Sequence, residues 1–294
     1  MNGFLNIDKP KGITSFGVVK NVRKRLGVKK VGHAGNLDPD ATGVLVLGVG
    51  KGTRFLEYIT TLEKEYIATV KLGILTDTLD ISGEVIDEKP VPDIEESRLK
   101  VILKKFVGEI FQTPPAFSAV RIGGKRLYEL AREGVLVNKK PKKVKIYKIE
   151  LLGVAGDEFM IRVVCSKGTY IRSLAKDIAE ALGTYGIVKE LRRMRIGHFR
   201  VDDAVSPDVD DLEKFIMPID KGLAHLNEIV LSERAAWYFR NGSKIGMGGI
   251  VHKSRFVKAF EHVRVYDNLG NFIGVGYMKW DGVQPEKVLP AEGS

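Results

Sequence analysis

The sequence predicts an α+β protein: a mixed, largely antiparallel sheet with flanking helices, followed by a small β-rich domain. Helical stripes and alternating segments follow one another irregularly, without the strand–helix–strand repeat of parallel folds. Segments 66–72 and 159–165 alternate apolar and polar residues, as half-buried strands do. Near residue 228 the pattern changes to one short helix and a hairpin. We therefore expect two domains, residues 1–227 and 228–294.

Local signals place the elements of the first domain in order. Ser15 is positioned to cap a helix with an apolar stripe that ends at Gly27. Residues 44–49 form a continuous apolar run, which predicts a buried strand. A second amphipathic helix ends at Gly108. The apolar stripes of these two helices are Val19, Val22 and Leu26, and Leu99, Leu103 and Phe106.

The later elements show similar signals. A helix is expected after Thr169, with a stripe of Leu174, Ile178 and Leu182, and Gly183 is positioned to end it. In the second domain Ser232 opens a short helix. Residues 263–266 and 272–277 then form a hairpin around a turn at 268–271.

Composition limits the class of protein. The chain of 294 residues has a single cysteine, Cys165, so no intrachain disulfide can form, which fits a reducing compartment. No stretch reaches the roughly 18 apolar residues of a membrane span, and the first ten residues lack a basic leader pattern. We expect a soluble cytoplasmic protein that does not bind membranes.

Basic residues are concentrated in two segments. The net charge is +10, and residues 121–148 alone hold ten basic side chains against two acids. Residues 189–200 add five basic side chains against one acid. Such concentration favours an anionic partner, although a charge run by itself is slightly more typical of a solvated face.

The segment GHAGNLDPDATG, residues 32–43, places an acid on a stiff loop before the predicted buried strand. Pro39 fixes its own φ and keeps Asp38 out of the helical region. Gly35 and Gly43 allow close backbone approach. Such a loop can hold one carboxylate in a fixed orientation. Taken alone, an Asp-Pro step more often makes a simple turn.

Four segments in one order resemble the TruB family of pseudouridine synthases, which act on the T-arm of tRNA. They are DKPKGITS (8–15), the Asp38 loop, EKEYIATVKLG (63–73) and CSKGTYIRSLAKDIAEALG (165–183). The match departs at Ala34 and Asn36, where Thr-type residues are more usual, and Asp40 adds a second acid. The tail resembles a PUA domain, a small β-barrel-like RNA-binding module.

This resemblance implies catalytic residues. Asp38 matches the acid that acts either as the nucleophile or as the base that drives glycal formation. Arg172 matches the arginine that pairs with this acid, and a guanidinium so placed would depress the pKa of the carboxyl. Tyr66 matches the aromatic residue that stacks on the uracil and could help remove its C5 proton.

The resemblance also implies RNA contacts. His33 matches a residue that fills the space left by the flipped base, which lowers the cost of unstacking. Lys167 stands at the entrance of the predicted helix, where its charge and the helix terminus favour a phosphate. Tyr170 is a further expected RNA contact. Lys9 matches a position that shapes the pocket.

The basic segment about 121–148 matches an RNA-clamping insert. We expect a small helix there, with mobility that is lost when tRNA binds; Arg126 and Lys142 are its expected RNA contacts, and Arg193 is the expected contact from the second basic cluster.

The implied activity is isomerisation of the uridine at position 55 of tRNA to pseudouridine, with base flipping. This reaction needs no cofactor and no metal, and the insert favours action without a protein partner. Two alternatives remain: a guide-RNA-dependent enzyme of the dyskerin type, or a non-catalytic tRNA-binding or tRNA-folding protein. The combination of Asp38, Arg172 and Tyr66 favours an enzyme, because a binding module does not require it.

Overall fold

The large sheet gathers strands from most of the first 200 residues. The computed structural model describes residues 1–115, 121–122, 125–126 and 140–290. The main path of the sheet runs β1 (Gly3–Lys9), β3 (Thr42–Val49), β12 (Gly186–Ile196), β4 (Lys64–Leu72), β11 (Glu158–Cys165), β10 (Lys142–Ala155) and β7 (Gly108–Gln112). β2 (Val31–His33) pairs with β3, and β13 (Phe199–Arg200) pairs with β12.

Along this path the pairs are antiparallel except where β12 runs parallel to β3, through Arg192 and Arg193. Two small hairpins lie outside the sheet: β5 (Ile74–Thr76) with β6 (Val85–Glu88), and β8 (Arg121–Ile122) with β9 (Lys125–Arg126). The α+β prediction with a largely antiparallel sheet is confirmed.

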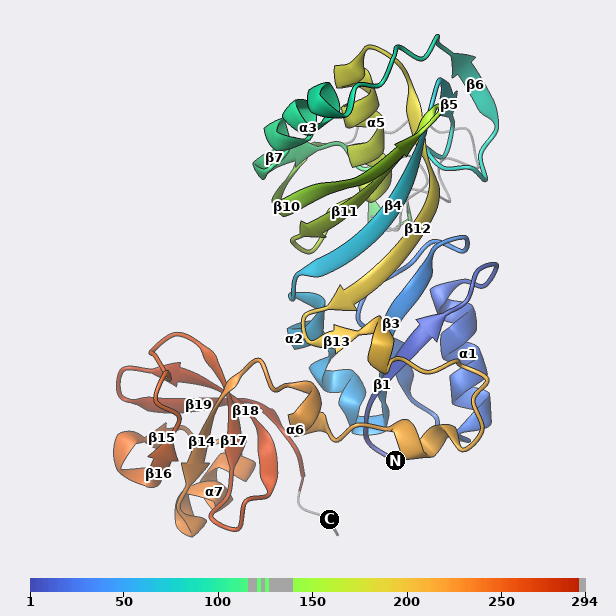
Figure 1. The fold of residues 1–294 in the computed structure, drawn as a ribbon. Coiled ribbons are helices and arrows are strands. Elements are labelled where there is room, and N and C mark those ends of the chain that lie inside the picture. The colour runs from blue at the N-terminus through green and yellow to red at the C-terminus, as the bar shows by residue number, and fades with distance from the viewer. Residues whose placement is uncertain (116–120, 123–124, 127–139, 291–294) are drawn as a thin grey trace.

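Two helices, α3 (Glu96–Lys105) and α5 (Ile171–Leu182), cover one face of the sheet (Figure 1). α1 (Ser15–Arg25) packs beside β1 and β3 through its own apolar cluster. The shorter helical segments of this part are η1 (Gly50–Phe55), α2 (Leu56–Thr60), η2 (Val201–Asp203), η3 (Leu212–Phe215) and α6 (Ile219–Gly222).

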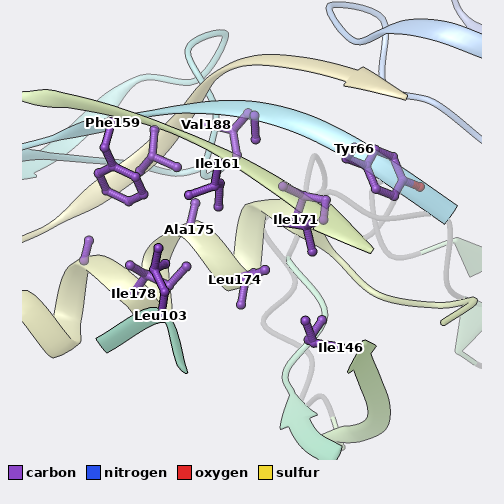
Figure 2. Packing of buried hydrophobic residues seen from close by; sticks show 14 of the residues in the cluster. Tyr66, Leu103, Ile146, Phe159, Ile161, Ile171, Leu174, Ala175, Ile178 and Val188 are labelled. Carbon is purple, nitrogen blue, oxygen red and sulfur yellow. The ribbon is translucent and has the colours of Figure 1, made fainter. Parts of the chain in front are cut away.

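The main core lies between α5 and the strands. Phe159 and Ile161 of β11 face Leu174 and Ile178 of α5, and Tyr66 lies at one end of this cluster (Figure 2). β4 alternates strictly between buried and half-exposed residues, as its sequence predicts. α5 has the predicted stripe, and Gly183 ends it with a φ of 93°. Tyr66, near the start of β4, thus belongs to the edge of the main apolar core.

The prediction that Ser15 caps α1 is wrong by one residue. The N-cap is Thr14, whose side chain accepts a hydrogen bond from the Gly17 amide. Ser15 is buried instead: its hydroxyl donates to Leu37 O (3.1 Å), and Leu37 N–H donates to the Ser15 hydroxyl (2.8 Å). The first turn of α1 thus fixes the loop that carries Asp38.

The C-terminal sheet runs β15 (Ile245–Gly246), β19 (Gly282–Val288), β18 (Phe272–Lys279), β17 (His262–Tyr266), β14 (Asn227–Leu231) and β16 (Ile250–Lys253). α7 (Glu233–Arg240) packs on it and is capped by Ser232, as predicted, while η4 (Met247–Gly249) is short. β17 and β18 form the predicted hairpin. This confirms the β-rich character of the tail.

The tail contacts the first part of the chain through β19, which lies against the η1–α2 segment. Arg54 Nη1 donates to Val288 O (2.8 Å), and Lys287 pairs with Glu57 (2.9 Å). α6 packs on β1 and leads into β14, which joins the two parts (Figure 1). The boundary at residue 227 stays a prediction.

Gly43→Ala is expected to destabilise the protein by about 3 kcal/mol or more, because two costs combine. Gly43 has a φ of +100°, and a Cβ there would lie 2.2 Å from Arg193 O across the parallel β3–β12 contact. Urea unfolding would measure the loss. The control is Gly156→Ala, where φ is +60° and nothing lies within 4 Å of the added carbon; it should cost only about 1 kcal/mol. Equal losses in both variants would contradict the proposed backbone clash.

Candidate active site

The loop that carries Asp38 is held from several sides. Besides the Ser15–Leu37 bonds, Gly12 N–H donates to Pro39 O (2.9 Å) and Ala41 N–H donates to Asp38 O (3.1 Å). The loop lies between β2 and β3, whose buried strand anchors its far end. A carboxylate on such a loop has little conformational freedom to lose when it acts.

Lys9 supports this loop from behind. Its side chain is 0% exposed, and its ammonium donates to Pro39 O (2.9 Å), Pro10 O (2.9 Å) and Ile13 O (2.6 Å). Burial lowers the pKa of Lys9 to about 8, and the charge of Asp40 is the main influence against that shift. The expectation that Lys9 contacts RNA is corrected: it is a buried clamp on the Asp38 loop.

Arg193 fastens the other end of the loop. Its side chain is 1% exposed, with Nη1 donating to Asn36 O (3.1 Å) and Nη2 to Gly35 O (3.2 Å). Nε donates to Val44 O (2.7 Å). Its guanidinium is therefore buried and directed at main-chain carbonyls, and it also lines the pocket beside Asp38. The RNA contact expected from this residue stays a prediction.

Asp38 and Arg172 form a bidentate ion pair, as the resemblance implied. Arg172 Nε lies 3.0 Å from Asp38 Oδ2, and Nη2 donates to Oδ1 at 3.2 Å. The Arg172 side chain is 7% exposed, whereas that of Asp38 is 34% exposed and accessible from the pocket. Two nearly parallel bonds fix the plane of the carboxylate.

Burial raises the pKa of the Asp38 carboxyl above its ordinary value, and the Arg172 guanidinium opposes this rise. The expected net depression of the pKa is thus wrong in direction. Desolvation disfavours the charged acid more strongly than the arginine favours it, and the nearby Asp80 charge adds to the rise. The result is a carboxylate that is more basic than a solvated aspartate.

Asp80 is a site residue that the sequence did not reveal. Arg172 Nη1 lies 3.2 Å from Asp80 Oδ2 and donates to Thr78 O at 2.8 Å. The Thr-Asp-Thr-Leu-Asp segment, residues 76–80, has the composition of a turn with side-chain capping, and Thr78 does donate to Asp80 Oδ1 (2.7 Å). Its proximity to Arg172 depends on main-chain bonds between Val188 and the residues flanking Asp80, which sequence alone does not predict.

The start of α5 is fixed by β7. The Gln112 side chain accepts from Tyr170 N–H (3.0 Å) and donates to Tyr170 O (3.2 Å). Ser173 Oγ donates to Thr113 O (2.8 Å). These bonds set the direction in which Arg172, in the first turn of the helix, reaches Asp38.

A pocket of about 230 Å³ opens beside Asp38 and brings the expected residues together. Tyr66 is buried in its wall, and burial raises the pKa of its phenol, while the Arg193 guanidinium opposes that rise. Lys167 is exposed at the rim and Tyr170 is half-buried. The other lining residues are Ala34, Gly35, Asn36, Leu37, Thr60, Lys64, Ser166, Gly168, Thr169, Ile171, Arg172, Leu191 and Arg193.

Two expected RNA contacts, His33 and Lys142, are not among the lining residues. His33 ends β2, and its Nδ1 accepts from Gly35 N–H at 3.3 Å. Lys142 is exposed at the start of β10. The backbone of Arg126 belongs to β9, while its side chain and the expected helix of the insert lie outside the described residues.

Two further properties of the described ranges bear on function. No group of three or more His, Cys, Asp or Glu side chains in them is arranged to hold a metal ion. None of the helices described has the length and apolar character required to cross a membrane. The arrangement beside Asp38 offers a basic carboxylate, a fixed guanidinium and an aromatic wall, which suits acid–base or nucleophilic chemistry on a planar group.

Comparison with known proteins agrees with this geometry. Residues 23–171 match the pattern described as TruB family pseudouridylate synthase, N-terminal domain; residues 172–232 and 228–289 match two TruB C-terminal patterns. The chain is 40% identical to tRNA pseudouridine synthase B of Clostridium tetani, over 98% of this chain and 100% of that one. It is 37% identical to tRNA pseudouridine synthase B of Stutzerimonas stutzeri, over 99% and 97%.

Among solved structures, the chain resembles a protein of the Cbf5-Nop10-Gar1 complex, with a TM-score of 0.77 and 28% identity over 98% of this chain and 85% of that one. The matches to the family patterns and to the curated relatives both extend over nearly the whole chain. This protein belongs to the TruB family of pseudouridylate synthases.

Proposed function

We propose that this protein isomerises the uridine at position 55, in the T-arm of tRNA, to pseudouridine. The observation that carries the proposal is the Asp38 carboxylate, held bidentately by Arg172 at the edge of a pocket walled by Tyr66. Relatives of 37% and 40% identity over nearly the whole chain are tRNA pseudouridine synthases B. The pocket also suits a planar base.

Asp38 begins the reaction, either as the nucleophile at C1′ or as the base that removes the C2′ proton. Its raised pKa serves the second role in particular, because a more basic carboxylate is a better proton acceptor. Arg172 fixes the orientation of the carboxylate. Tyr66 stacks on the uracil and assists the loss of the C5 proton after the base has turned.

The target uridine must leave the T-loop stack to reach this pocket, which costs a few kcal/mol. His33, at the end of β2, is proposed to occupy the space that the base leaves. Lys167, at the rim of the pocket, and Lys142, exposed at the start of β10, are proposed phosphate contacts. Affinity should then fall steeply with salt.

We also propose a role for each of the two domains. Residues 1–227 are proposed as the catalytic domain, with the insert 121–148 as its RNA clamp, and residues 228–294 as a PUA-like RNA-binding domain. The protein is proposed to work in the cytoplasm, without cofactor, metal or protein partner.

The test is tritium release from an unmodified T-arm stem-loop RNA labelled at C5 of its uracils. The protein alone, without added metal or nucleotide, should release tritium until one uridine per RNA is converted. An RNA in which only the position 55 uridine is replaced by cytidine should release none. Release from the replaced RNA would contradict the assignment of the site.

A guide-RNA-dependent enzyme of the dyskerin type is a second candidate, favoured by the similarity to a protein of the Cbf5-Nop10-Gar1 complex. The identity there is 28%, against 37–40% for the tRNA enzymes. The same assay separates the two. A protein that binds the stem-loop tightly yet releases tritium only with a guide RNA and partner proteins would be of the second kind.

A further inference from the structure

Two buried cations, Lys64 and Arg193, line the pocket and have no assigned role in the proposed reaction. Lys64 precedes Tyr66 by two residues on β4, so the two side chains share a face of the strand. Arg193 on β12 is the register partner of Tyr66 across the sheet. Both line the same pocket as Asp38 and Tyr66.

Neither cation is paired with an acid in the described part of the chain. The Lys64 side chain is buried, and its ammonium donates to Thr60 O (2.5 Å) and Leu62 O (2.6 Å), at the C-terminal end of α2. The Arg193 guanidinium likewise donates to three main-chain carbonyls. Arg172 differs, because it is balanced by Asp38 and Asp80.

Buried charges are costly unless they are paired, so two cations without an acidic partner leave the pocket with net positive charge on this side. Burial lowers the pKa of Lys64 to about 8, which keeps it largely charged at neutral pH. An ammonium has three donors, and the two carbonyls account for two of them. The third donor and the excess charge suit an anion that forms within the pocket.

Resting on the proposed function, we infer that Lys64, with Arg193 behind Tyr66, stabilises the negative charge that develops on uracil as its glycosidic bond breaks. When the N1–C1′ bond breaks, its electron pair stays with the base, which becomes an anion with charge shared by N1, O2 and O4. Preorganised cations at such a site act on charge that exists only during the reaction.

The rest of the step balances with groups already present. At C1′, either Asp38 forms a new C–O bond, or it accepts the C2′ proton and the sugar becomes a glycal. After the base turns, C5 bonds to C1′. On the first route the bond from Asp38 to C1′ breaks and frees the carboxylate; on the second, Asp38 returns its proton to C2′. The proton lost from C5 is balanced by the proton gained at N1, so no co-reactant is consumed.

The test compares leaving groups under single-turnover conditions, using stem-loop RNAs with uridine or 5-fluorouridine at the target position. Fluorine withdraws electrons and makes the base a better leaving group, so it needs less help from a cation. Lys64→Met should slow consumption of uridine by about tenfold or more, and that of 5-fluorouridine by about threefold or less. Lys64→Arg, which keeps the charge, should restore most of the uridine rate.

Lys9→Met is the matched control, because Lys9 is equally buried and carbonyl-bound but lies outside the lining of the pocket. It should slow both substrates by the same factor. If thermal unfolding shows that Lys64→Met is misfolded, Lys64→Gln takes its place, because glutamine keeps a hydrogen-bond donor without the charge. Equal slowing of both substrates by the neutral Lys64 variant, or no slowing, would overturn the inference. A wild-type protein inactive on uridine would instead overturn the proposed function.

Discussion

Asp38→Asn should abolish isomerisation and leave RNA binding almost unchanged. The amide has the shape of the carboxylate but can neither attack C1′ nor accept a proton, so we expect the rate to fall by about 10³-fold or more. The affinity for the T-arm stem-loop should stay within about threefold, because phosphate contacts dominate binding. Tritium release and filter binding on the same preparation would measure both.

Asp40→Asn is the control, because Asp40 lies two residues away on the same loop and makes no bond to Arg172 in the described structure. It should keep activity within about threefold of the wild type. If Asp38→Asn retained substantial activity, or if Asp40→Asn lost as much, the acid would be wrongly assigned.

The wild-type pH profile provides a second measure of Asp38. The active form is the carboxylate, and burial raises its pKa. Activity should therefore fall as the pH is lowered through this raised pKa, beginning at a higher pH than a solvated aspartate would give. If activity declined only at or below the pH range in which a solvated aspartic acid titrates, burial would not be raising the pKa of Asp38 as the structure indicates.

Elements that depend only on residues close together in the sequence were predictable. α5, with its stripe and its Gly183 stop, depends on residues within a dozen positions of one another. The alternation of β4 and the hairpin of β17 and β18 are equally local. Asp38, Arg172 and Tyr66 came from motifs whose order along the chain indicated a shared site, although Arg172 is more than a hundred residues from the other two.

Roles that depend on tertiary placement were not predictable. The motif position of Lys9 and the basic cluster around Arg193 suggest RNA contacts, yet both side chains are buried against carbonyls of the Asp38 loop. Ser15 has the residue type of a helix cap, and only the fold shows that it holds Leu37 instead. Asp80 reaches the site because its turn, with Leu79 at a φ of +62°, is tied to Val188 by main-chain bonds.

Arg172→Met should inactivate the enzyme and destabilise it at the same time, since one guanidinium serves two acids. Without it, Asp38 and Asp80 are left facing each other, and both desolvation and repulsion raise the pKa of Asp38 further. The rate should fall by about 10³-fold at neutral pH, and the acid limb should move to higher pH. The loss of stability should be about 2 to 3 kcal/mol, below the usual cost for a buried pair because Asp38 is 34% exposed.

Two companion variants separate charge from geometry. Arg172→Lys retains a cation but cannot bind both oxygens of Asp38 and also reach Asp80, so it should regain stability more than rate. Arg172→Met combined with Asp80→Asn should recover stability by removing the repulsion, and should remain inactive because Asp38 is still unoriented. Urea unfolding and kcat/KM against pH would measure each. A double variant that regained activity would show that Arg172 only balances charge, and that the bidentate grip on Asp38 contributes nothing to the reaction.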